Sequence, residues 1–198
     1  MLQHVLESAL RQTMNRLVRP VLNPAVPVPL QRRIVRQAYR SSTPPRGAKF
    51  ENITIGGVPA TRTTFGNDPR GAVLYLHGGG YIIGSSSTHR GITGHLAKTT
   101  GCAIVTPDYR LAPEFPFPAA LDDAEACWNG LLEAGLKPDQ IAVAGDSAGG
   151  GLSVALAMRL RDKRLQLPAS LTAFSPWIDL TQEQLYAPEI EPVLQASW

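Results

Sequence analysis

The chain has 198 residues, of which 43% are hydrophobic and 18% charged, and its formal net charge is +3. This size fits one domain, and the composition is that of a globular protein rather than a disordered or collagen-like one. The sequence predicts no transmembrane helix, because it has no run of 18 apolar residues, and its N-terminus lacks the continuous apolar segment of a secretion signal. We therefore expect a cytoplasmic protein.

Positive charge is concentrated at the N-terminal end. Residues 1–49 hold nine Arg or Lys and one acid, Glu7, whereas the remainder holds ten bases and fifteen acids. Such an arm suits contact with a membrane surface or an acidic partner, but a solvated helix face is the interpretation we favour. Tyr39 is the one aromatic residue among these bases, so no nucleic-acid partner is expected. The oligomeric state is left open.

Two cysteines, Cys102 and Cys127, are too few for a disulfide framework. They are interpreted as reduced thiols of the protein core, in keeping with a cytoplasmic location. A disulfide between them is the alternative.

Two helices are predicted near the N-terminus. Apolar residues recur at helical spacing over residues 2–18, and this amphipathic helix should end near Pro20. A proline-rich connector follows over residues 23–29. Residues 30–39 predict a second, basic helix, with Ile34 and Ala38 on one face, and residues 41–45 predict a loop.

After residue 50 the pattern changes to strands alternating with helices. Residues 52–55 and 60–65 flank Gly56-Gly57 and predict a hairpin. The nearly continuous apolar run over residues 72–76 is typical of a strand buried on both faces. Further strands are expected at residues 103–105, 141–144 and 171–174, and helices at 88–100, 119–134 and 149–163. About six strands in this order predict a mostly parallel sheet covered by helices.

Ser147 lies in the segment Gly145-Asp146-Ser147-Ala148-Gly149, between a predicted strand and a predicted helix. Small residues there allow the strained turn, called a nucleophile elbow, that exposes a serine hydroxyl. The N-terminus of the following helix favours a developing oxyanion. A plain glycine-rich turn with a capping serine is the alternative.

A glycine loop, His77-Gly78-Gly79-Gly80-Tyr81, directly follows the apolar strand. Backbone N–H groups of such a loop can stabilise the anionic intermediate of acyl transfer. A phosphate-binding loop is disfavoured, since no Gly-Lys-Ser/Thr follows. We interpret His77 as a residue that orients the loop and not as a catalytic base.

These two segments, with residues 108–114 (Asp-Tyr-Arg-Leu-Ala-Pro-Glu) and 175–180 (Ser-Pro-Trp-Ile-Asp-Leu), resemble the hormone-sensitive-lipase-like family of α/β-hydrolases. The resemblance spans roughly residues 45–180. It implies an α/β-hydrolase fold with N-terminal cap helices (residues 1–45) on a core (residues 46–198). It also implies hydrolysis of small-molecule carboxylic esters with short to medium acyl chains, without metal or organic cofactor.

The resemblance assigns roles to individual residues. Ser147 would be the nucleophile, and the backbone N–H groups of Gly79, Gly80 and Ala148 would form the oxyanion hole. His77, Gly78 and Asp146 would support these two motifs. Arg110 and Glu114 would be internal partners that brace the core, whereas His89 and His95 are expected to be helix-start and surface residues.

The C-terminal part departs from the family, which places an acid and a histidine on later segments. No histidine follows Ser147, and Asp179, Glu183, Glu189 and Glu191 do not match the position of the acid. We therefore expect a core that is incomplete at its C-terminal edge, through an in-frame end or a frameshift after about Gln182. Such a chain should be nearly inactive and poorly soluble. A non-catalytic ligand-binding homologue and a non-functional fragment are the alternatives.

Overall fold

The structure is a computed structural model that describes residue 12 and residues 20–21, 23, 25–39 and 42–179. The helix expected over residues 2–18 lies outside the described residues, apart from residue 12. The acidic residues considered after position 180 also lie outside them.

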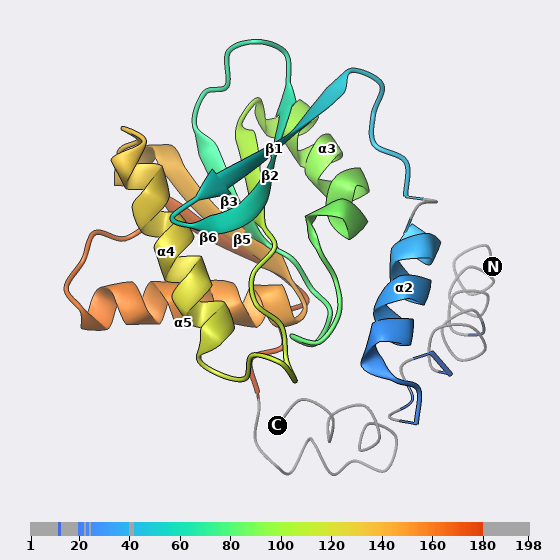
Figure 1. Ribbon diagram of the computed structural model, residues 1–198. Helices are drawn as coiled ribbons and strands as arrows, with labels where there is room; N and C mark the ends of the chain where they lie inside the picture. The colour runs from blue at the N-terminus through green and yellow to red at the C-terminus, as the bar shows by residue number, and fades with distance from the viewer. Residues whose placement is uncertain (1–11, 13–19, 22, 24, 40–41, 180–198) are drawn as a thin grey trace, which may run out of the picture.

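A single six-stranded sheet forms the centre of the molecule, with strand order β1-β2-β4-β3-β5-β6 (Figure 1). The four strands β4, β3, β5 and β6 run parallel, while β1 and β2 are antiparallel to their neighbours. The expected number of strands and the mostly parallel sheet are therefore confirmed. The strands are β1 (Ala48–Ile55), β2 (Val58–Phe65), β3 (Ala72–Leu76), β4 (Ala103–Pro107), β5 (Ile141–Asp146) and β6 (Ser170–Phe174).

Four α-helices are described: α2 (Val28–Ala38), α3 (Arg90–Thr100), α4 (Ala119–Glu133) and α5 (Ala148–Asp162). A short 3-10 helix, η3 (Ser86–His89), leads into α3. The last three α-helices match their expected ranges within two residues. Helix α2 begins two residues earlier than expected, because Pro29 lies in its first turn, where a missing backbone N–H has no consequence.

Both faces of the sheet are covered, which explains the apolar sequence of its central strands. Every residue of β3 is buried. Leu74 and Leu76 belong to a core cluster with Trp128 of α4 and Leu156 of α5. The alternate residues of β3 belong to a second cluster with Ala97 of α3. Helices α4 and α5 therefore cover one face and α3 covers the other.

The hairpin turn contains Gly56 and Gly57, both with positive φ, as a two-residue turn between antiparallel strands requires. A Cβ atom at Gly56 would lie 2.0 Å from the carbonyl oxygen of Ala126 in α4. The turn thus packs directly on the backbone of this helix, and only glycine fits there.

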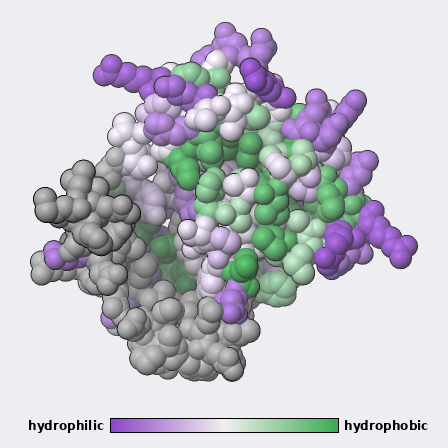
Figure 2. All heavy atoms as spheres, turned by 180° about the vertical axis from the view of Figure 1, so that it is seen from behind, coloured by the Kyte–Doolittle hydropathy of each residue, from purple (hydrophilic) through white to green (hydrophobic). Residues whose placement is uncertain are grey.

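At the other end of the order, β6 pairs only with β5 within the described residues. Its large apolar side chains, Leu171 and Phe174, stay 38% and 39% exposed. Figure 2 shows that hydrophobic residues gather in a broad patch on the side of the molecule turned away from the viewer in Figure 1.

Both cysteines are free thiols, but only one belongs to the core as expected. Cys127 is buried, and burial raises the pKa of its thiol to about 12. Cys102, directly before β4, is partly exposed and packs against the edge of the second core cluster. In the part of the chain that the structure describes, no helix is long and apolar enough to cross a membrane.

Candidate active site

Ser147 occupies a sharp turn between the last residue of β5 and the first residue of α5. Its backbone has φ 52° and ψ −121°, a conformation rarely adopted by a residue with a side chain. The residue is exposed, and its hydroxyl makes no recorded hydrogen bond with any described residue. This geometry leaves the hydroxyl free to meet a ligand.

Glycines on both sides of Ser147 permit the turn. A Cβ atom at Gly145 would lie 2.3 Å from the carbonyl oxygen of Gly149. A Cβ atom at Gly149 would lie 2.0 Å from the carbonyl oxygen of Leu76 and 2.5 Å from that of His77. The first turn of α5 therefore packs directly on the backbone where β3 ends and the glycine loop begins.

Backbone hydrogen bonds fix Ser147 against the segment that follows β6. Its N–H donates to the carbonyl of Phe174 over 3.0 Å, and its carbonyl accepts from the N–H of Trp177 over 2.9 Å. The carbonyl also accepts from the N–H of Gly151. These hydrogen bonds hold the elbow to the end of β6 and the segment after it on one side, and to α5 on the other.

The glycine loop follows β3 and turns back on itself. Gly79, Gly80 and Tyr81 all have positive φ, at 126°, 61° and 61°. The carbonyl of Gly79 accepts hydrogen bonds from the N–H groups of Ile82 and Ile83, which close the turn. A Cβ atom at Gly79 would lie 2.2 Å from the carbonyl oxygen of Ile83, so this position needs glycine.

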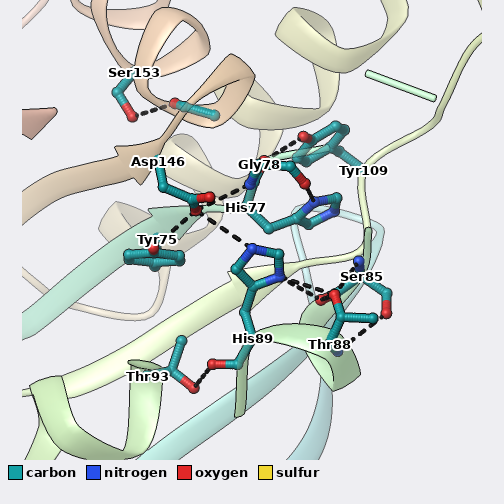
Figure 3. Close-up of polar contacts among 11 residues, drawn as sticks. Tyr75, His77, Gly78, Ser85, Thr88, His89, Thr93, Tyr109, Asp146 and Ser153 are labelled. Atoms are coloured by element: carbon teal, nitrogen blue, oxygen red, sulfur yellow. Dashed lines mark hydrogen bonds and ion pairs between the residues drawn. The ribbon is translucent and has the colours of Figure 1, made fainter. Parts of the chain in front are cut away.

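Asp146 joins the elbow to the glycine loop (Figure 3). Its Oδ1 accepts hydrogen bonds from the Tyr75 hydroxyl over 2.8 Å and from the Gly78 N–H over 3.0 Å, and it lies 3.4 Å from Nε2 of His89. Burial by itself would raise the pKa of Asp146, but these three partners together lower it below its usual value. The residue is therefore a carboxylate that binds three donors.

His77 is fully buried beneath this loop. Its Nδ1 lies 2.9 Å from the carbonyl oxygen of Gly78, which can only accept, so Nδ1 carries the proton. Its ring stacks on Tyr109 with centroids 4.2 Å apart, and the Tyr109 hydroxyl donates to the His77 carbonyl. Burial, helped by the neighbouring His89, lowers the pKa of His77 to about 3. With Nδ1 bound to the glycine loop and its pKa lowered, His77 stays neutral near pH 7.

His89 is where the sequence interpretation was wrong. It does stand at the start of α3, but it is only 6% exposed and does not lie on the surface. Its Nδ1 faces the hydroxyl of Thr88 and the carbonyl of Ser85, which leaves Nε2 to face Asp146 (Figure 3). The residue is buried because α3 packs on the sheet behind the loop. His95, in contrast, is exposed on α3 as expected.

Arg110 and Glu114 brace other elements, but both are partly exposed and not internal as expected. The Arg110 guanidinium and backbone N–H both bind the carboxylate of Asp123 in α4. Glu114 forms a two-pronged ion pair with Arg32 of α2. Both residues belong to the connection between β4 and α4, and such connections normally lie at the protein surface.

An apolar cavity of about 400 Å³ adjoins the elbow. It reaches Gly151 and Trp177, the two residues whose N–H groups bind the carbonyl of Ser147. Most of its wall is hydrophobic, including Tyr81, Phe115, Phe117, Leu121, Val154, Met158 and Ile178.

The sequence analysis gave three residues no role in this site: Tyr75, His89 and Tyr109. One signal was present, since Tyr75 is the only polar side chain in an otherwise aliphatic buried strand, and a buried tyrosine hydroxyl normally finds a partner. The structure brings the elbow and the glycine loop together. No group of His, Cys, Asp and Glu among the described residues is arranged to hold a metal ion.

Comparison with known proteins supports the same lineage. The sequence profile of one family, described as alpha/beta hydrolase fold, matches residues 73–197. The chain is 41% identical over 161 residues to a putative acetyl-hydrolase, LipR, of Mycobacterium tuberculosis, covering 78% of this chain and 52% of the relative. It is 43% identical over 131 residues to an acetyl-hydrolase of Streptomyces hygroscopicus, covering 66% and 44%.

Solved structures are similar as well. EstE7, a homologue of hormone-sensitive lipase from a metagenome library, superposes on this chain with a TM-score of 0.73 and is 41% identical in sequence. The match covers 76% of this chain and 52% of EstE7. An esterase of the bacterial hormone-sensitive lipase family gives a TM-score of 0.79 at 36% identity, covering 94% and 67%. The chain spans about half the length of the curated relatives it matches.

Proposed function

Because the chain belongs to the hormone-sensitive-lipase-like family of α/β-hydrolases, whose members are carboxylic-ester hydrolases, we propose that it carries the nucleophile and oxyanion hole of a serine esterase for small-molecule esters. The observation that carries this proposal is the exposed Ser147, held at φ 52° between β5 and α5 next to a glycine loop. We also propose a cytoplasmic location, which the two free thiols support because disulfides are rare in that compartment.

The proposed reaction is acyl transfer through the Ser147 hydroxyl. Its oxygen attacks the ester carbonyl carbon, the bond to the alcohol breaks, and the hydroxyl proton goes to the departing alcohol oxygen. Water then adds to the acyl-serine, which releases the acid and restores the Ser147 hydroxyl. Backbone N–H groups of Gly79, Gly80 and Ala148 would stabilise the negative charge that develops on the carbonyl oxygen. Asp146 would hold the loop and the elbow in register by binding the Gly78 N–H.

The apolar cavity beside the elbow supports an acyl or alcohol group of modest size. It is walled mainly by aromatic and aliphatic side chains and reaches the residues that hold the carbonyl of Ser147. Its volume of about 400 Å³ lies at the low end of the range for small-molecule sites. Short to medium acyl chains are therefore the proposed substrates.

Serine at its ordinary pKa is a weak nucleophile and needs a general base, and the described residues place none beside Ser147. Among the described histidines, His77 and His89 are buried in the network behind the loop and His95 is exposed on α3. None of these three has a recorded contact with Ser147 in the described part of the chain. We therefore expect the 198-residue chain alone to hydrolyse esters about 10⁶-fold more slowly than a chain with a complete site.

The test is hydrolysis of p-nitrophenyl butyrate by this chain and by Ser147→Ala, with and without added imidazole. After subtraction of the hydrolysis that imidazole alone causes, we expect slow turnover that imidazole stimulates and that Ser147→Ala lacks, because free imidazole can act as the base that no described residue supplies. Fast turnover lost in Ser147→Ala would show that the chain already has a base. Equal rates for both proteins with imidazole would overturn the proposal, and ester binding without turnover would instead indicate a ligand-binding homologue.

A further inference from the structure

Helix α2 carries three arginines, Arg32, Arg33 and Arg36. Arg32 is anchored to the core: its guanidinium donates to the carbonyls of Ile82 and Ala112 and to the carboxylate of Glu114. Arg33 and Arg36 are three residues apart, so their side chains are neighbours on the helix surface, and both are exposed. The anchor fixes the direction in which this second pair points.

A cavity of about 540 Å³ lies between this face of α2 and the start of α3. Arg33, Arg36 and Arg90 all line it, and no acidic residue is found among the described residues of its wall. Arg90 is held in place over the ring of Phe50, with its guanidinium carbon 5.0 Å from the ring centroid. Three guanidinium groups therefore share one hollow, without an ion-pair partner recorded in the described part of the chain.

Neutral hydrogen-bonding groups complete the wall. The side chains of Tyr39, Ser42 and Ser87 line the same cavity and carry hydroxyl groups. Like charges gathered in one hollow repel each other unless an anion lies between them. Planar guanidinium groups bind the oxygen atoms of phosphate with two parallel hydrogen bonds, which lysine cannot do.

We propose that this hollow, the α2–α3 arginine cleft (Arg33, Arg36 and Arg90), is a binding site for a phosphate group. The site is separate from the proposed esterase site, since none of its lining residues belongs to the elbow or the glycine loop. The phosphate belongs either to a small soluble phosphate ester or to the headgroup of an anionic lipid, and the same three guanidinium groups recognise it in both cases.

The experiment compares two triple variants of the full chain. One changes Arg33, Arg36 and Arg90 to Gln. The matched control changes the exposed cations Arg70, Lys137 and Arg164 to Gln, which removes the same charge elsewhere. Binding of glycerol 3-phosphate is measured by ³¹P NMR line broadening, and binding of vesicles by cosedimentation, with phosphatidylglycerol against phosphatidylcholine. Circular dichroism establishes that each variant is folded.

We expect the cleft variant to bind phosphate at least about tenfold more weakly than the control variant. Loss with glycerol 3-phosphate identifies a soluble ligand, and loss with phosphatidylglycerol vesicles alone identifies a lipid headgroup. Changing the three arginines to Lys should weaken binding by less than changing them to Gln. Equal binding by the cleft and control variants in both assays, or no binding by the unmodified chain, would overturn the proposal.

Discussion

The backbone N–H of Gly78 donates to the carboxylate of Asp146 over 3.0 Å, and this one bond joins the glycine loop after β3 to the elbow after β5. The two segments are 68 residues apart in the chain. Their alignment therefore depends on a side chain of the residue next to Ser147 and not on the sheet alone.

Replacing Asp146 with Asn should destabilise the fold and misalign the loop. A neutral amide oxygen accepts less strongly than a carboxylate from the three donors Tyr75, Gly78 and His89, and hydrogen bonds to a charged group contribute about 1.5–3 kcal/mol. We expect a loss of about 2 kcal/mol in the free energy of unfolding, measured by urea denaturation. Asp162→Asn is the control, because Asp162 is exposed. Equal losses in both variants would contradict the prediction.

His77 should make the fold sensitive to mild acid. Its pKa is lowered from 6.5 to about 3, so the unfolded chain binds a proton that the folded chain does not. Stability that is fully present above pH 6.5 should therefore fall by about 1.4 kcal/mol per pH unit toward pH 3. The lowered pKa of Asp146 acts only below its usual value of 3.8.

The measurement is the free energy of unfolding in urea at several pH values between 7 and 4. His77→Asn keeps a donor near the position of Nδ1 but does not titrate, and it should lose this part of the slope. His95→Asn, which changes an exposed histidine, should retain it. The prediction is wrong if the His77 variant shows the same dependence as the unmodified chain.

Arg32→Lys should loosen helix α2. Lysine keeps the charge, but it cannot make the bonds that Arg32 shares among Ile82, Ala112 and Glu114. Backbone amides of α2 should exchange about tenfold faster with deuterium, which corresponds to about 1.4 kcal/mol of lost local stability. Arg33→Lys, at the next helix position, should leave exchange unchanged. Unaltered α2 protection in Arg32→Lys would show that the anchor lies elsewhere.

The exposed apolar side of β6 should make the chain self-associate. Leu171→Lys places a charge on this edge strand, and charged edges resist pairing with other chains. We expect a larger monomer fraction by size-exclusion chromatography with light scattering. Thr54→Lys, on the opposite edge strand β1, is the control and should change the fraction little. A monomeric unmodified chain with a sharp melting transition would contradict the prediction.

Local patterns in the sequence were sufficient for most of the fold. The central strands are buried on both faces and therefore appear as continuous apolar runs, as at residues 72–76. The turn at Gly56-Gly57 has its own local signature. The start of α2 was placed too late, because Pro29 resembles a connector residue although it is acceptable in the first turn of a helix.

The site was predictable only where its parts are contiguous. The elbow and the glycine loop are continuous segments with recognisable residues. The connections among Tyr75, His89 and Asp146 link three separate elements, and no spacing in the chain encodes them. The sequence analysis placed His89 at the start of a helix and gave it no part in the site. Only the packing of α3 on the sheet shows that it is buried.

The amide of Ser147 donates to the carbonyl of Phe174, the last residue of the edge strand. If β6 separates from β5 even briefly, this amide loses its acceptor before the rest of α5 is disturbed. Its hydrogen-exchange rate would then measure how often β6 separates from β5. Ser147 directly follows Asp146, whose carboxylate holds the glycine loop. The exchange rate of the Ser147 amide would thus report how often the edge of the sheet that supports the elbow opens.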